Sequence, residues 1–264
     1  DEVMRGIRTA MDEVKPDAWL VAENGDFVAS DLDGFGWHGA MNYQGFMRPL
    51  WNWINQNSSI GGGFQGLPFE MPKIGGKSLV ASMVQFSSSI PWRSLVASMV
   101  LLDSHDTARM RTVVSGDRKA HLSAMTAMLT YPGVPSIFAG DEIGLEGSWG
   151  EDSRRTINWE DRSGWDHDFL AEAKKLIELR RTQDGLIEGG LRWVAVEDNF
   201  ICYLRESNKQ SVLVFISRKA VRTEIDLAGY GLKVVKTLYG PDATGASIKI
   251  DSDGATQGIW EVKS

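Results

Sequence analysis

The 264-residue sequence is poor in cysteine, in long apolar runs and in clustered positive charge. Its single cysteine, Cys202, excludes an internal disulfide framework and a thiolate metal site. No apolar run reaches the roughly 18 residues that span a bilayer, and no signal-peptide pattern is seen, so we predict no membrane association and a cytoplasmic location. The 28 basic residues are scattered among 35 acidic ones, which argues against a nucleic-acid partner.

Hydrophobic residues, by contrast, make up 42% of the chain, and tryptophan occurs ten times. This content is sufficient for a substantial core, in one large domain and a smaller one. Most of the tryptophans are expected to pack in that core, although the apolar face of an indole ring also stacks well on a sugar.

Short strand-like runs alternate with helical patterns along the first two thirds of the sequence. Near the N-terminus, apolar residues at helical spacing mark one helix face: Val3, Ile7, Ala10, Met11 and Val14. Pro16 ends this helix, and "DAWLVAE" then reads as a short buried strand that runs into Glu23. The same alternation follows in "MNYQGFMRPLWNWI", "KSLVASMVQFSSSI" and "WRSLVASMVLLDSHD".

The heptapeptide "SLVASMV" occurs twice, at residues 78–84 and 94–100. We interpret the two copies as coincidentally similar helices, because a spacing of about sixteen residues is too short for the known repeat arrays. Further along, "KAHLSAMTAMLT" predicts a helix, residues 136–139 a strand, and "DFLAEAKKLIELRRT" another helix.

Strands that alternate with helices predict a parallel sheet covered by helices, and the active sites of such sheets lie at the carboxyl ends of the strands. Polar residues follow several predicted strands: Glu23, Asn42, His105 with Asp106, and Asp141 with Glu142. One such carboxylate is usually a cap or an ion-pair partner. Several at equivalent places favour a functional site.

From about residue 190 the pattern changes to alternating strands and polar turns, which predicts an all-β domain. The boundary falls near "TQDGLIEGG", so we predict an α/β domain over residues 1–186 and a β-domain over residues 187–264.

Five ordered segments resemble the second half of the α-amylase family, glycoside hydrolase family 13, especially its α-glucosidases, neopullulanases and cyclomaltodextrinases. These segments are "WLVAEN", "GWHGAMNYQGFMRPLW", "LLDSHDTAR", "GVPSIFAGDEIGLEG" and "SRRTINWE". The resemblance implies the second half of a TIM (β/α)8 barrel, followed by a C-terminal β-sandwich. It also implies a retaining glycosidase that hydrolyses α-1,4 or α-1,6 glucosidic bonds in maltooligosaccharides or related α-glucans.

By the same resemblance, Glu23 is the general acid/base and Asp106 is the carboxylate that stabilises the oxocarbenium-like transition state. A retaining mechanism needs a protonated acid and an ionised partner about 5 Å apart, so paired carboxylates suit it. The residues implied or predicted to bind the sugar are His105, Arg154, Trp37, His38, Asn42 and Tyr43. A plain ion pair is the alternative for Arg154, and packing is the alternative for Trp37 and Tyr43.

The nucleophile that the resemblance implies is missing, because the sequence holds no G-x-R-x-D motif. The first four strands of the barrel are missing too. Without them, the remaining half would have two open sheet edges. We therefore predict that the chain is a fragment, or one chain of a split enzyme. An N-terminal half, from the same protein or from a second chain, would complete it, and the chain alone would be inactive.

No metal or other cofactor is predicted within the chain, whereas the family implies that calcium is possible in the N-terminal half. The expected partners are an α-linked oligosaccharide and that N-terminal half, and the sandwich is compatible with a homodimer. Asp141 and Glu142 are assigned to shaping a strand end. The alternative function is a non-catalytic carbohydrate- or partner-binding relative of the same fold, although the retained acid and transition-state carboxylate count against it.

Overall fold

The computed structural model describes residues 2–25, 28–32, 34–56 and 71–264. Up to residue 188, short strands alternate with helices. The strands are β1 (Val21–Ala22), β2 (Gly39–Ala40), β3 (Met99–Leu101) and β4 (Val134–Ser136). The α-helices are α1 (Glu2–Val14), α2 (Arg48–Ile54), α3 (Gly76–Ser88), α4 (Trp92–Val96), α5 (Met110–Val113), α6 (Arg118–Thr130), α7 (Gly150–Ser153), α8 (His167–Thr182) and α9 (Asp184–Glu188). Other helical turns are η1 (Ala29–Asp31), η2 (Tyr43–Met47) and η3 (Asp141–Ile143).

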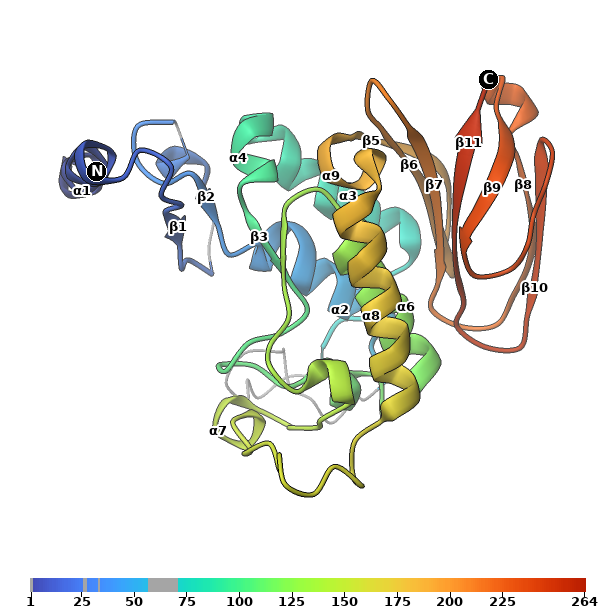
Figure 1. The fold of residues 1–264 in the computed structure, drawn as a ribbon, viewed down its shortest axis with the longest axis horizontal. Coiled ribbons are helices and arrows are strands. Elements are labelled where there is room, and N and C mark those ends of the chain that lie inside the picture. The colour runs from blue at the N-terminus through green and yellow to red at the C-terminus, as the bar shows by residue number, and fades with distance from the viewer. Residues whose placement is uncertain (1, 26–27, 33, 57–70) are drawn as a thin grey trace.

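The four short strands run parallel and lie side by side in chain order. β1 pairs with β2, β3 pairs with β4, and a parallel bridge between Met41 and Met99 joins the two pairs. The helices α6 and α8 pack against each other beside these strands (Figure 1). Because the strands are parallel, the segments that follow them emerge at one common edge.

The strand expected at residues 136–139 is placed two residues too late, since β4 spans Val134–Ser136. Gly133 has a positive φ of 129°, and it turns the chain so that the Val134 N–H donates to the carbonyl of Ser98. A turn in which the Asp141 N–H donates to the Phe138 carbonyl then ends the extended segment. These two turns set the limits of the strand.

The two copies of "SLVASMV" fold differently, so their interpretation as two helices is wrong. The first copy lies within α3, where Leu79 and Met83 are buried one turn apart. In the second copy the helix α4 ends at Val96, and Met99 begins the strand β3. Tertiary context overrides local propensity here, because β3 has β4 as its pairing partner.

The chain from residue 190 is built of β-strands, as its alternating pattern predicts. They are β5 (Gly190–Glu197), β6 (Phe200–Glu206), β7 (Ser211–Ser217), β8 (Val221–Asp226), β9 (Lys233–Tyr239), β10 (Ser247–Ser252) and β11 (Gln257–Lys263), with the turn η4 (Ala228–Tyr230). Five of them form an antiparallel sheet in the order β5-β6-β7-β11-β9, and β8 pairs with β10.

The two faces of the five-stranded sheet serve different cores. Phe200, Cys202 and Leu204 point into a β-sandwich core with side chains of β8 and β10, whereas Ile201 and Tyr203 belong to the core of the α/β part. This division follows from the period of two along a strand. Burial raises the pKa of the Cys202 thiol, which therefore stays protonated and acts as a small apolar group.

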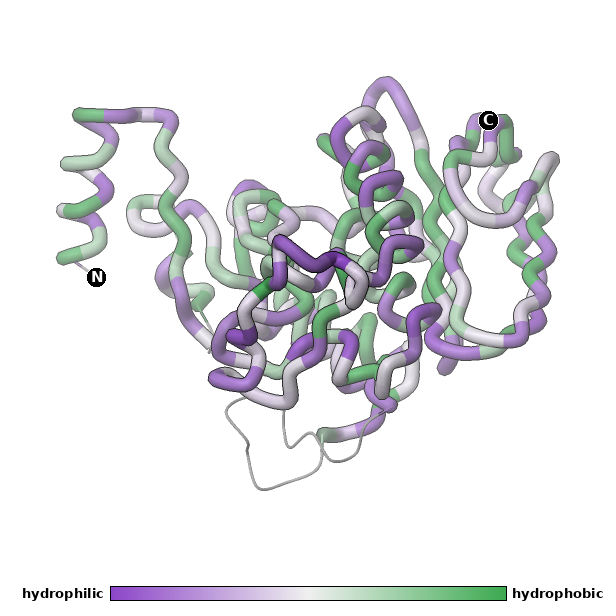
Figure 2. The backbone as a smooth tube through the Cα atoms, turned by 60° about the horizontal axis from the view of Figure 1, so that its bottom comes forward, coloured by the Kyte–Doolittle hydropathy of each residue, from purple (hydrophilic) through white to green (hydrophobic). Residues whose placement is uncertain are grey.

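The N-terminal helix α1 stands apart from the other helices (Figures 1 and 2). None of its residues is buried, and the apolar face that the sequence predicts is open to solvent, with Val3 68% and Val14 86% exposed. None of the described helices has the length and apolar character needed to cross a bilayer.

Candidate active site

The predicted acid and the predicted transition-state carboxylate lie at the carboxyl edge of the parallel strands. Glu23 directly follows β1 and is exposed, and Asp106 lies in the segment that follows β3. Tyr43, which follows β2, lies close enough to both to sense their charge. Burial raises the pKa of its hydroxyl, and the carboxylates of Glu23 and Asp106 raise it further. Glu23 and Asp106 thus both follow strands at the same edge of the parallel sheet.

Asp106 is held by two basic side chains. The Arg154 guanidinium donates to Asp106 Oδ1 at 3.0 Å and, through Nε, to the carbonyl of His105 at 2.9 Å. His105 Nε2 lies 3.4 Å from the same Oδ1. Because about half of the Arg154 side chain is exposed, this pair contributes at most about 1 kcal/mol to folding. Its main effect is to fix the direction of the Asp106 carboxylate.

A chain of hydrogen bonds supports the loop that carries Asp106. The buried Tyr43 hydroxyl donates to Ser104 Oγ at 3.1 Å, and the Asp106 N–H donates to the same oxygen at 3.2 Å. Thr107 Oγ1 accepts from the Ser104 N–H at 2.9 Å. Tyr43 is only 2% exposed, so its predicted contact with a sugar is revised to this supporting role.

Asn42, like Tyr43, supports the fold rather than lining a surface. Its side-chain oxygen accepts from the Gly45 N–H at 2.8 Å and so caps η2, and the residue is fully buried. A side chain beneath the surface cannot contact a sugar, so we revise the predicted sugar contact.

Trp37 and His38 lie at the other end of the strands from the carboxylates. Both precede β2, and His38 Nδ1 accepts from the N–H of Leu20, just before β1, at 2.9 Å. They line a small cleft of about 170 Å³ together with Arg8 and Arg93. Partial burial and the charge of Arg8 lower the pKa of His38, which keeps its ring neutral. We therefore revise the prediction that these two residues line the sugar site.

A buried arginine, Arg109, lies beneath the loops of the site and was not predicted from the sequence. Arg109 is 1% exposed, and its guanidinium donates to Asp141 Oδ1 at 2.7 Å, to the Ala139 carbonyl at 2.9 Å and to the Ser153 carbonyl at 2.9 Å. Ser153 directly precedes Arg154. Arg109 thus ties the end of β4 to the loop that presents Arg154, and Asp141 has the structural role assigned to it.

Asp141 shares its buried surroundings with a second carboxyl group, that of Asp103. Burial raises the pKa of Asp141 well above its ordinary value, the neighbouring Asp103 raises it further, and Arg109 opposes the shift. Asp103 Oδ2 accepts from the Met110 N–H at 2.6 Å. Because one guanidinium faces two buried carboxyl groups, the protonated form of Asp141 is favoured relative to that of an exposed aspartate.

Asp141→Asn is expected to preserve this cluster and to change only its response to pH. An asparagine amide can still donate to Asp103 and accept from Arg109, without a proton to lose. In the wild type the raised pKa means that stability is greatest at acid pH and declines as the pH rises through the folded-state pKa. The variant should therefore gain on the wild type as the pH rises from about 4, near the unfolded-state pKa, toward 8, by at most about 1.4 kcal/mol per pH unit. Thermal unfolding of the complete protein across this range measures the difference.

Asp152→Asn is the control, because the Ser148 N–H and Arg155 lower the pKa of this carboxyl. That contribution is present at neutral pH and is lost as the pH falls, so this variant should be less stable than the wild type at neutral pH and approach it in acid. If the stability of the wild type and that of Asp141→Asn changed equally with pH, the raised pKa of Asp141 would be contradicted.

A cleft of about 460 Å³ opens beside His105 and Arg154, the two partners of Asp106. It is lined by His105, Arg109, Phe138, Ala139, Arg154, Arg155, Thr156, Ile157 and Trp159. This volume lies within the range of roughly 300–1,000 Å³ that is usual for small-molecule sites. Among the residues that the structure describes, no group of three His, Cys, Asp or Glu side chains is placed to hold a metal ion.

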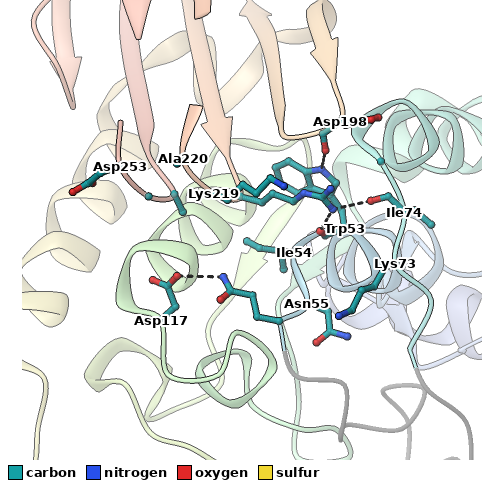
Figure 3. Close-up of a pocket in the computed structure, with 15 residues that line it drawn as sticks. Trp53, Ile54, Asn55, Lys73, Ile74, Asp117, Asp198, Lys219, Ala220 and Asp253 are labelled. Carbon is teal, nitrogen blue, oxygen red and sulfur yellow. Dashed lines mark hydrogen bonds between the residues drawn. The ribbon is translucent and has the colours of Figure 1, made fainter. Parts of the chain in front are cut away.

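A second cavity, of about 660 Å³, lies where the α/β part meets the β-sheets (Figure 3). Trp53 and Ile54 come from the end of α2, and Lys219 and Asp253 come from turns between β-strands. Arg218 joins the two parts by donating to the carbonyls of Trp53 and Ile74. None of the predicted site residues lines this cavity.

Parallel strands flanked by helices, with acidic groups at their carboxyl edge and a β-sheet domain after them, place the chain in the α/β class, in which active sites lie at the carboxyl ends of the strands. The chain belongs to the α-amylase family. Residues 1–175 match the family model described as the catalytic domain of alpha amylase. This confirms the family that the sequence motifs indicate.

Curated relatives include a cyclomaltodextrinase of a Bacillus species, 28% identical over 247 residues, and an intracellular maltogenic amylase of Bacillus subtilis, 29% identical over 223 residues. These alignments cover 92% and 83% of the chain but only 40% and 35% of the relatives. The chain thus spans well under half the length of either.

Among solved structures, a debranching enzyme from Nostoc punctiforme matches with a TM-score of 0.85 at 22% identity, over 98% of the chain and 54% of that structure. A cyclic α-maltosyl-(1→6)-maltose hydrolase from Arthrobacter globiformis matches with a TM-score of 0.77 at 22% identity, over 97% of the chain and 52% of that structure. At these identities the likeness shows the fold, in which an α/β part is followed by a β-sheet domain.

Proposed function

We propose that the complete protein hydrolyses α-glucosidic bonds, α-1,4 or α-1,6, in maltooligosaccharides or related α-glucans. The observation that carries the proposal is Asp106, held by Arg154 and His105 at the strand edge where Glu23 is exposed. Relatives named cyclomaltodextrinase, amylopullulanase and maltogenic amylase support this substrate class. A relative named as intracellular supports the proposed cytoplasmic location.

In the proposed mechanism, Glu23 protonates the glycosidic oxygen of the leaving group and later removes a proton from the attacking water. Glu23 is exposed, so a substrate oxygen can reach it. Asp106, which is paired with Arg154, stabilises the positive charge that develops on the sugar ring. His105 and Arg154 donate hydrogen bonds to the same sugar.

We further propose that this α/β part, residues 1–186, is half of a (β/α)8 barrel and that a preceding segment supplies the other four strands and the nucleophilic aspartate. Among the described strands, β1 has β2 as its single partner and β4 has β3, so both outer edges are open. The exposed apolar face of α1 supports the proposal, because such a face is normally covered in a complete barrel. Residues 187–264 would form the C-terminal domain.

The test is hydrolysis of maltotriose and pullulan by the complete protein, with the first-formed anomer identified by proton NMR. Release of the α-anomer supports the retaining reaction, and release of the β-anomer would overturn it. Binding of these glucans without hydrolysis would instead favour a non-catalytic carbohydrate-binding relative.

A further inference from the structure

A buried hydrogen bond joins the two loops that carry the ion pair of Arg154 and Asp106. Ser153 directly precedes Arg154, and Thr107 directly follows Asp106. The Ser153 hydroxyl donates to the Thr107 carbonyl at 2.6 Å, and both residues are fully buried. The bond therefore connects the immediate chain neighbours of the two charged residues.

The backbone of Ser153 has little freedom to move. Its carbonyl accepts from Arg109 Nε at 2.9 Å, and the Arg109 N–H donates to the Gly147 carbonyl at 2.9 Å. Gly147 lies so close to Ser153 that a Cβ on Gly147 would come within 2.5 Å of the Ser153 Cα. These contacts set the direction in which the chain leaves Ser153 toward Arg154.

The helix α7, which ends at Ser153, also packs on the loop of Asp106. Gly150, the first residue of α7, is buried, and a Cβ on it would lie 3.4 Å from the backbone oxygens of both His105 and Asp106. Because Gly150, Ser153 and Thr107 are buried within the chain itself, their arrangement needs no further segment to explain it.

Arg154 needs such support, because its side chain is long and half exposed. An arginine has many rotamers, and an exposed ion pair by itself is too weak to select one of them. A hydrogen bond between a hydroxyl and a carbonyl that water does not reach is more costly to break. The bond from Ser153 to Thr107 thus limits where the Arg154 guanidinium can lie relative to Asp106.

We propose that Ser153 is a positioning residue for the proposed reaction. Its hydroxyl, bound to the Thr107 carbonyl, keeps the Arg154 guanidinium on Asp106 and so fixes the direction of that carboxylate toward the sugar. Ser153 is buried and does not touch the substrate, so it acts through Arg154. This inference rests on the proposed function, which assigns Asp106 and Arg154 to the sugar.

The test is a double-mutant cycle in the complete protein, with Ser153→Ala, Arg154→Gln and the two substitutions combined, and with kcat/KM for maltotriose as the readout. Ser153→Ala should lower kcat/KM about tenfold, because a small misplacement of an orienting group is costly. In the Arg154→Gln background the same substitution should change kcat/KM by less than about twofold, since the guanidinium that it positions is gone. A serine with a merely structural role would lower kcat/KM by the same factor in both backgrounds.

Ser217→Ala is the matched control. Ser217 is also fully buried and donates from its hydroxyl to a carbonyl, that of Thr256 at 3.3 Å, but it lies in β7 of the β-domain. The substitution should lower the unfolding temperature and leave kcat/KM within about twofold of the wild type. Ser153→Cys keeps a weak donor of similar size, so it should recover part of the activity, and it replaces Ser153→Ala in the cycle if the alanine variant does not fold.

Equal losses of kcat/KM in the two backgrounds would overturn the positioning role, while hydrolysis by the wild type would leave the proposed function intact. If the complete wild type binds maltotriose without hydrolysing it, the dissociation constant from calorimetry takes the place of kcat/KM in the same cycle. An effect of Ser153→Ala on binding that disappears in the Arg154→Gln background would then support the positioning role, although the proposed hydrolysis fails. An effect of equal size in both backgrounds would overturn both.

Discussion

Replacing Glu23 by glutamine in the complete protein is expected to lower kcat/KM for maltotriose by about 10²- to 10⁴-fold. Glutamine fills the same space but has no proton to give to the glycosidic oxygen. Because Glu23 is exposed at the end of β1, the substitution should leave stability within about 0.5 kcal/mol of the wild type. Steady-state kinetics and thermal unfolding of the same preparation measure the two effects.

The leaving group provides a sharper form of this test. Fluoride departs without protonation, so α-glucosyl fluoride should still react with the nucleophile of the variant. The glycosyl intermediate would then persist, because no base activates water. A fluoride burst of about one equivalent per active site is expected, and azide, which needs no base, should restore turnover.

Glu142→Gln is the matched control, since Glu142 is also a glutamate at a strand edge. Its carboxylate accepts from the Gly140 N–H at 2.8 Å, a bond that glutamine can keep, so activity should stay within about twofold of the wild type. A loss in the Glu23 variant that azide cannot rescue would argue that Glu23 has another role than acid and base.

The placement of Glu23 and Asp106 could be predicted because both follow strands whose apolar runs are legible in the sequence. Trp37, His38 and Asn42 could not be assigned in the same way. Strand β2 is only two residues long and has polar or aromatic residues on both sides. A strand this short has no alternation that would locate it in the sequence, so the residues that precede it could not be distinguished from those that follow it.

Arg109 was missed for a different reason. In the sequence it is one arginine after "HDTA", and arginine is most often exposed. It is buried because Asp141, 32 residues further along the chain, meets it in space. The acidic "GDE" turn after β4 was a signal that a buried basic partner exists, but local sequence does not identify that partner.

The same limit applies to the two copies of "SLVASMV". Both contain the same helix-forming residues, and the first is helical throughout. The second copy leaves its helix because Met99 pairs with Val134, a contact between distant segments. Family resemblance supplied what propensity could not, since the motifs fix the order of strands and sites together.

Asp106→Asn is expected to lower kcat/KM by about 10²- to 10³-fold for maltotriose and for α-glucosyl fluoride alike. The reason is that positive charge develops on the sugar ring in every step of the reaction, whichever leaving group departs. Asparagine can keep the hydrogen bond from Arg154, seen at 3.0 Å, but it supplies no negative charge. This pattern differs from that of the Glu23 variant, because neither fluoride as leaving group nor azide as nucleophile should rescue it.

Asp152→Asn is the matched control for Asp106, since it too removes the charge of an aspartate paired with an arginine, Arg155, at 2.7 Å. Asp152 also accepts from the Ser148 N–H, which turns its carboxylate toward the backbone of its own loop. Its activity should therefore stay within about twofold of the wild type. If Asp106→Asn only raised KM and left kcat unchanged, Asp106 would bind the ground state and the transition state equally. The proposed stabilisation of the developing charge would then be wrong, and the contacts with Arg154 and His105 would serve binding alone.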